Sequence, residues 1–174
     1  MKRDIRFSEK LLIAGLGFIF LFMIVQDWVP LGTLNDIQAI REEHSFNRLL
    51  LVTMINVGQI LLLIGLIILF IGKRYPIWVR LWLIIHQICI FAGVLLSWWI
   101  PYFFGYGSEQ IAESYHEMFG DTHTFLPLMN GIAPNTLHVL FHLTLLFCII
   151  VTIYISTTTR KKEKYNNNLS ENIS

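Results

Sequence analysis

The sequence predicts an all-α membrane protein in which four transmembrane helices form an up-down bundle. Hydrophobic residues make up 55% of the 174 residues and charged residues only 14%, whereas soluble domains average about 25% charged residues. The apolar residues fall in four blocks, each close to the ~20 residues that a helix needs to cross a ~30 Å hydrocarbon core. The charges fall almost wholly between the blocks, as expected where a bilayer excludes them.

The four helices are expected at about residues 11–29, 49–72, 77–100 and 136–156. The first follows a basic stretch, as the apolar region of a signal peptide does. It is longer than the about 7–15 apolar residues of a cleavable signal, and no small residues mark a cleavage site at its end. We therefore expect it to be retained as a membrane anchor.

Prolines mark the limits of the third helix. Pro76 precedes it, where a missing N–H costs nothing, and Pro101 follows it, where proline interrupts a helix. Before the fourth helix, residues 124–135 contain two prolines and an Asn-Gly pair, which predict a turn-rich but defined path. Residues 158–174 are polar and rich in Lys and Asn, so we expect a disordered cytoplasmic tail. The predicted transmembrane domain is thus residues 1–157.

The two long connections, residues 30–48 and 105–135, each contain a short amphipathic pattern. Residues 35–44 place isoleucines on one face and acidic side chains elsewhere. Residues 108–119 place apolar and aromatic side chains on one side, with Ser108 as the expected N-cap. Both segments are predicted to be short helices that lie on the outer membrane surface.

The placement of Lys and Arg predicts the orientation, because these residues concentrate on the cytoplasmic side of membrane proteins. Eleven of the 13 flank one membrane face: Lys2, Arg3, Arg6, Lys10, Lys73, Arg74, Arg80, Arg160, Lys161, Lys162 and Lys164. Only Arg41 and Arg48 fall on the other side. The chain is therefore expected to be a multi-pass protein of the cell membrane, with both termini cytoplasmic and both long connections outside.

Polar side chains inside hydrocarbon are costly, so they usually face the protein interior and are functional candidates. Four are expected in the buried polar interior: Asp27, Asn56, Gln59 and His86. Asn56 and Gln59 are expected to hydrogen-bond across helices, with His86 bonded to one of them. A glycine at every seventh position predicts a close-packing seam along the second helix, at Gly58, Gly65 and Gly72.

The third helix carries a stripe of polar and small residues that we expect to face the bundle interior, namely Trp82, His86, Cys89, Gly93 and Ser97. Histidines on two facing helices can ligate a haem. His86 is expected to lie deeper in the membrane than His142, and this mismatch disfavours haem.

Histidines and carboxylates make a divalent transition metal a candidate ligand. His138 and His142 are four apart on the fourth helix, so one helix face presents both imidazoles. The sequence has no HExxH motif, which excludes a zincin-type protease. Glu113 and His116 form an ExxH pair, with His123 further along the same connection. A single such pair does not make a ferritin-like di-iron site, which needs two. The structural alternative is histidines bonded to neighbouring helices and a solvated surface helix.

These candidates concentrate in the outer half of the predicted bundle, so we expect a polar, histidine-containing site open to the outer face. The inner half is expected to be apolar. The function that best fits is a non-enzymatic binding or accessory protein in the lipid bilayer, as a homo-oligomer or in a larger membrane complex. The alternatives are a metal-dependent enzyme that uses His138 and His142, or a proton-coupled carrier with His86 as relay. The net charge of +1 suggests no nucleic-acid partner.

Overall fold

The computed structural model describes residues 4–171, and it describes side chains as far as Thr158. Within that range the chain is helical and forms no β-strand. Four segments are long and apolar enough to cross a membrane: α1 (Phe7–Trp28), α3 (Phe46–Phe70), Ile77–Phe104, and Thr136–Thr158 within α7 (Thr136–Glu171). The predicted all-helical class with four candidate membrane spans is confirmed.

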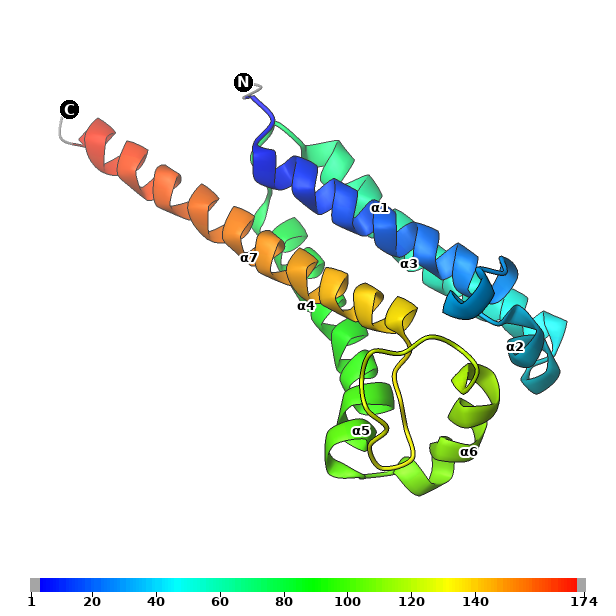
Figure 1. The fold of residues 1–174 in the computed structure, drawn as a ribbon. Coiled ribbons are helices and arrows are strands. Elements are labelled where there is room, and N and C mark those ends of the chain that lie inside the picture. The colour runs from blue at the N-terminus through cyan, green and yellow to red at the C-terminus, as the bar shows by residue number, and fades with distance from the viewer. Residues whose placement is uncertain (1–3, 172–174) are drawn as a thin grey trace.

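The four long helices pack in the order α3, α1, α7, α4. Both termini lie at one end of the molecule, and the shorter helices α2, α5 and α6 lie at the other, which we call the connection end (Figure 1). Because α1 and α7 occupy the middle of this order, their apolar faces are the best buried. Leu16, Ile19 and Leu145 are fully buried in the shared core. Helices α3 and α4 each leave one face uncovered by the rest of the chain.

Helices α1 and α7 approach most closely at a glycine. A Cβ atom on Gly15 would lie 2.6 Å from the Sγ atom of Cys148, far inside an ordinary van der Waals contact of about 3.5–4.0 Å. The predicted glycine seam on α3 is wrong for this chain. Gly58 and Gly65 face open space, and Gly72 follows the end of α3 with a φ of +68°. The close packing within the described chain is therefore between the two central helices, α1 and α7.

The third membrane segment does not end at Pro101. Helix α4 (Ile77–Val94) continues through a π-helical turn, η2 (Leu95–Trp99), into α5 (Ile100–Phe104). Pro101 has no N–H to donate to the carbonyl four residues earlier, that of Ser97. The hydroxyl of Tyr115 donates to that carbonyl instead, at 3.0 Å. This substitute bond satisfies the carbonyl that the proline leaves free, so the helix continues past Pro101.

Helix α7 is longer than expected, because it runs from Thr136 to Glu171 and so includes most of the tail that we expected to be disordered. The last three residues, 172–174, lie outside the described residues. Extending an existing helix costs little compared with nucleating a new one. The hydroxyls of Ser156 and Thr158 also bond to carbonyls of the preceding turn.

Two short helices occupy the connections. Helix α2 (Ile37–Glu43) begins at Asp36, whose side chain accepts the N–H groups of Gln38 and Ala39. Helix α6 (Ser108–Phe119) has Gly107 as its N-cap residue, with a φ of +76°. Ser108 as N-cap was therefore wrong: its hydroxyl donates backwards to the carbonyl of Gly105 at 2.9 Å.

The stripe expected to face the interior from the third helix faces outward. Trp82, Cys89, Gly93 and Ser97 are exposed, whereas Leu83, Gln87, Val94 and Trp98 are buried. The two sets are offset by about one residue. Helix α4 is covered on one side, by α7, so the contact with α7 decides which stripe is buried.

Candidate functional site

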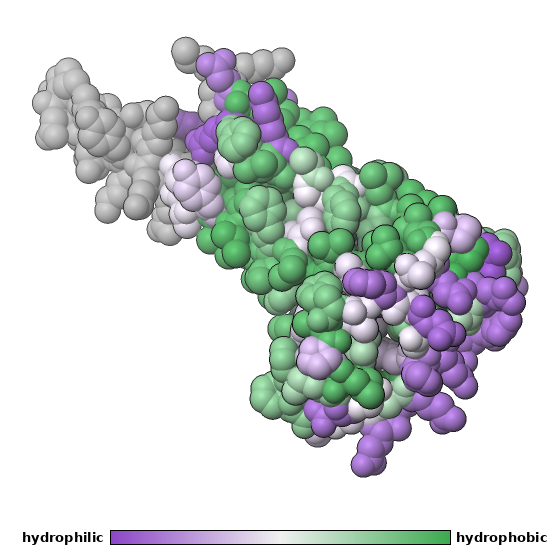
Figure 2. Space-filling model, viewed as in Figure 1, coloured by the Kyte–Doolittle hydropathy of each residue, from purple (hydrophilic) through white to green (hydrophobic). Residues whose placement is uncertain are grey.

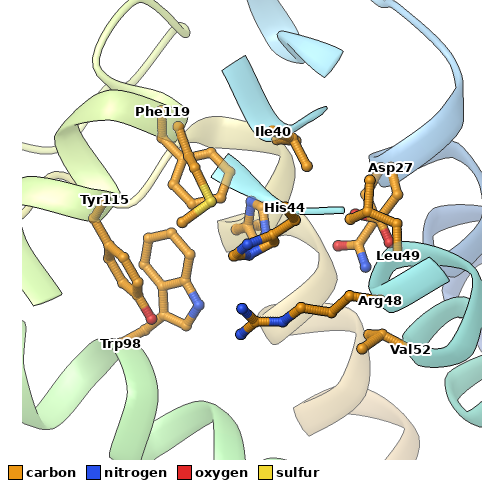
Figure 3. A pocket seen from close by; sticks show the side chains of 12 residues that line it. Asp27, Ile40, His44, Arg48, Leu49, Val52, Trp98, Tyr115 and Phe119 are labelled. Atoms are coloured by element: carbon orange, nitrogen blue, oxygen red, sulfur yellow. The ribbon is translucent and has the colours of Figure 1, made fainter. Parts of the chain in front are cut away.

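A pocket of about 310 Å³ lies at the connection end of the molecule (Figure 3). Its lining comes from the last turn of α1, from α2 and the residue after it, from the first turns of α3, from the η2 turn, from α6 and from the first turn of α7. Its polar lining consists of Gln26, Asp27, His44, Arg48 and His138. Its apolar lining consists of Ile40, Leu49, Val52, Trp98, Tyr115, Met118 and Phe119. The pocket is therefore amphipathic.

Asp27, at the end of α1, is buried, with 8% of its surface exposed. The hydroxyl of Thr53 on α3 donates to its Oδ2 atom at 3.2 Å. That hydroxyl oxygen in turn accepts the indole N–H of Trp28 at 2.9 Å. Because a hydroxyl has a single proton, the indole bond directs this proton to the carboxylate. Within residues 4–158, Asp27 forms no ion pair with a Lys or Arg side chain, but the His44 ring lies close enough to interact with its charge.

His138 lines the pocket and has one ring nitrogen free to accept a hydrogen bond. The side-chain oxygen of Asn135, which caps α7, accepts the backbone N–H of His138 at 2.9 Å. This bond identifies the atom as oxygen, an acceptor. The same oxygen lies 2.7 Å from Nδ1 of the His138 ring, so Nδ1 carries the proton. The Nε2 atom of the neutral ring is then an acceptor.

His44, which follows α2, uses the same ring nitrogen, Nδ1, with a different partner. Its Nδ1 atom lies 2.9 Å from the backbone carbonyl of Glu43, which only accepts hydrogen bonds, so Nδ1 carries the proton. Its side chain projects into the middle of the pocket, between Asp27 and Trp98 (Figure 3). Its Nε2 atom is therefore the ring nitrogen left for a partner in the pocket.

The aromatic wall is built around Trp98 of the η2 turn. Its ring centroid lies 4.5 Å from that of Tyr115, 4.7 Å from that of His138 and 5.3 Å from that of Phe119. Burial raises the pKa of the Tyr115 phenol above its usual value of 10.0, so the phenol stays protonated. Since its proton is donated to Ser97, Tyr115 contributes a ring face to the pocket and not a free hydroxyl.

The residues predicted as metal ligands are not brought together. In the part of the chain that the structure describes, no three His, Cys, Asp or Glu side chains gather closely enough to hold a metal ion. Glu113 and His116 lie on the exposed face of α6. Nδ1 of His123 lies 2.8 Å from the hydroxyl oxygen of Thr136. The expectation of a shared metal site is corrected accordingly, because α6 turns its ExxH face away from α7.

His142 lies apart from the pocket although it is one turn from His138. Its ring centroid is 6.0 Å from that of Trp98 and 5.8 Å from that of Trp99. It borders a separate apolar groove of about 330 Å³ with side chains such as Phe91 and Leu143. The two histidines share one helix face, as predicted, but Trp98 lies against both rings and His138 alone lines the polar pocket.

The predicted hydrogen bonds between helices from Asn56, Gln59 and His86 do not form within the described chain. The Gln59 amide donates to Asn56 on the same helix, at 3.5 Å. The His86 ring stacks on Trp82, also on its own helix, with centroids 5.5 Å apart. These residues lie on the two outermost helices of the packing order, α3 and α4, each of which is covered by a long helix on one side only.

The sequence analysis missed a buried polar contact in the half of the molecule near the termini. Gln87 of α4 is fully buried, and its amide donates to the Thr152 hydroxyl of α7 at 3.0 Å. Nearby, Arg80 donates to the carbonyl of Ser156 at 3.3 Å. We had expected that half to be purely apolar, and this expectation was wrong. The four-residue spacing of Thr152 and Ser156 was the available signal.

These two polar regions are not continuous with each other. Along the buried face of α7, the apolar Leu145 and the buried thiol of Cys148 separate His142 from Thr152. Ten residues of helix span about 15 Å. His86, the residue considered as a proton relay, lies on the outward face of α4 beside Trp82. The described residues thus offer no support for a proton path through this chain.

Comparison of the chain with models of protein families, with curated proteins and with solved structures finds no match. The class of the protein therefore follows from its own structure, which is an all-helical chain with four candidate membrane-spanning helices. The amphipathic pocket at the connection end is its candidate functional site.

Proposed function

We propose that the chain is a multi-pass protein of the cell membrane whose four spans form an up-down bundle with both termini in the cytoplasm. The Lys and Arg bias supports this orientation. Hydrophilic surface gathers at the connection end, and a largely hydrophobic surface covers the long helices (Figure 2). Helices α2 and α6 then lie at the outer membrane surface as amphipathic helices, and the pocket opens to the outside.

Thiol labelling tests this orientation. Glu113→Cys places a thiol on exposed α6, and Lys162→Cys places one beyond the last span. The native cysteines, Cys89 and Cys148, lie within candidate spans, and the unmodified chain gives the background. An impermeant maleimide should label Glu113→Cys in intact cells and Lys162→Cys only after permeabilisation. Labelling of both from one side, or the reverse pattern, would overturn the proposed topology.

We further propose that the protein is a non-enzymatic binding protein whose outer pocket takes a small amphipathic molecule. One observation carries this proposal. The buried carboxylate of Asp27, which pairs with no Lys or Arg side chain in residues 4–158, shares a pocket with an aromatic wall around Trp98. Concave sites with an apolar lining and a few convergent polar groups are the usual form of small-molecule sites. The metal-enzyme alternative loses its basis because its candidate ligands do not converge.

Binding is tested with a panel of ligands on the wild type and on a variant whose pocket is filled by a larger side chain. Small amphipathic amines, carboxylates and zwitterions are added to the purified protein in detergent, and thermal unfolding is followed. Saturation to about 100 times Kd stabilises a folded protein by about 2.7 kcal/mol. Val52→Trp adds a large side chain to the lining, whereas Met54→Trp adds it to an exposed position of the same helix.

At least one class of compound should raise the unfolding temperature of the wild type and of Met54→Trp, but not that of Val52→Trp. The proposal fails if the whole panel leaves the wild type unchanged. It also fails if Val52→Trp is stabilised as much as Met54→Trp, since the compound would then bind elsewhere.

A further inference from the structure

We infer that the ligand of the outer pocket is a small zwitterion with an apolar body, its ammonium group held at Asp27 and its carboxylate at Arg48. The inference rests on the proposed binding function and adds the chemical class of the ligand. The pocket lining contains one acidic side chain, Asp27, and one permanently cationic side chain, Arg48. Within residues 4–158 neither of them forms an ion pair with a Lys, Arg, Asp or Glu side chain.

The Asp27 side of the pocket offers hydrogen-bond acceptors. The carboxylate accepts from the Thr53 hydroxyl and has the His44 ring nearby, but no Lys or Arg side chain in residues 4–158 pairs with it. A buried carboxylate without a strong cationic partner is costly. The Nδ1 contact of His138 leaves the Nε2 atom of its neutral ring as a further acceptor. An ammonium group has three N–H donors and a positive charge. It therefore supplies a positive charge to the Asp27 carboxylate and an N–H donor to the His138 ring.

The Arg48 side of the pocket offers donors. The Arg48 guanidinium points towards Trp98 and away from Asp27 (Figure 3). The indole nitrogen of Trp98 also faces the pocket interior in that view, and its N–H donates to no acceptor in the described part of the chain. A guanidinium binds a carboxylate through two parallel N–H bonds. An anionic group is therefore expected at this side.

Charge balance selects a zwitterion over a simple cation or anion. The formal charges of Asp27 and Arg48, the acidic and the permanently cationic side chain of the lining, cancel. A ligand with a single charge would pair with one of these side chains and leave the other without a partner. Ile40, Leu49 and Met118, a small apolar cluster, also line the pocket and suit a hydrocarbon body. A free amino acid with an apolar side chain has all three features.

Three probes that share one body test the charge requirement: L-phenylalanine, phenethylamine and 3-phenylpropionate. The second lacks the carboxylate and the third lacks the ammonium group. Binding to the full-length protein in detergent is measured by calorimetry. Hydrogen bonds to charged groups contribute about 1.5–3 kcal/mol, so phenylalanine should bind about tenfold to a hundredfold more tightly than either half.

Two substitutions assign the ends. Arg48→Gln should weaken phenylalanine binding about tenfold and leave phenethylamine unchanged. Asp27→Asn, which keeps an oxygen for the Thr53 hydroxyl, should weaken phenylalanine and leave 3-phenylpropionate unchanged. Arg41→Gln and Glu42→Gln are matched controls on exposed positions of α2 outside the pocket, and they should have no effect. Since Arg48 is exposed, its variant decides the matter if Asp27→Asn does not fold.

The outcomes separate this inference from the proposed function. If a half-molecule binds as tightly as phenylalanine, and Val52→Trp abolishes that binding, the pocket function stands and the zwitterion class is wrong. If none of the three probes binds, the inference is wrong, and the wider panel decides the pocket function by itself. If both charge variants weaken all three probes equally, the two ends are not assigned as inferred and the inference is overturned.

Discussion

The closest approach of two helices gives the sharpest stability prediction. Gly15→Ala places a Cβ atom 2.6 Å from the Cys148 Sγ atom, so the atoms must separate by about 1 Å to reach an ordinary contact. Cys148 is fully buried in the core and has little room to rotate. Overpacking of this kind costs about 1–3 kcal/mol. We expect the clash in Gly15→Ala to lower the free energy of unfolding by that amount, before the helix preference of Ala over Gly is added.

Gly17→Ala is the matched control, because a Cβ atom at Gly17 has no neighbour within 4 Å. Both variants gain the same intrinsic preference of Ala over Gly in a helix, about 1 kcal/mol, so their difference isolates the clash. Unfolding is followed by circular dichroism during SDS titration of mixed micelles. Adding Cys148→Ala removes the clashing atom and should recover about 1 kcal/mol or more. Equal stability of the two single variants would refute the close approach of α1 and α7.

Further predictions concern other parts of the fold. Asn135→Ala removes the cap of α7 and should destabilise the protein by about 1 kcal/mol in the same assay, whereas Asn135→Ser restores a capping oxygen and should recover part of that loss. Thr152→Val removes the hydroxyl that accepts from the buried Gln87 amide and should cost about 1–3 kcal/mol. The double variant with Gln87→Leu should cost less than Thr152→Val alone. A double variant that costs more would show that the pair is not formed. Absorbance titration should show the Tyr115 phenol ionising above pH 10.0 in the folded protein. Since the unfolded chain loses this proton at lower pH, the contribution of Tyr115 to stability is complete below pH 10.0 and is lost as pH rises through the folded pKa. Tyr115→Phe should remove that alkaline loss.

Sequence patterns located the elements more reliably than the faces by which they pack. The third and fourth segments begin where expected, at Ile77 and Thr136. The buried face of α4 was misassigned because apolar side chains occur on all sides of this helix. Periodicity alone therefore does not distinguish the side that faces a helix from the side that faces lipid. The same ambiguity led us to place Asn56 and Gln59 between helices, although they lie on an outer helix of the packing order.

The candidate site was predicted in part. The sequence directed attention to the connection end, where the pocket lies, and to Asp27 and His138, which line it. It did not single out Trp98, His44 or Arg48. These residues come from separate segments and carry no shared spacing, so only the docking of α2 and α6 against the long helices reveals that they line one pocket.

The sequence alone determined the helical class, the four candidate spans and the charge bias, because hydrocarbon length and the cost of burying charge act on each segment separately. The tertiary structure decided which faces meet. A glycine opposite a cysteine brings α1 and α7 together, and the free carbonyl before Pro101 ties α6 to the third span through Tyr115. Such contacts depend on positions in different helices, and the local periodicity of one helix contains no information about its neighbour.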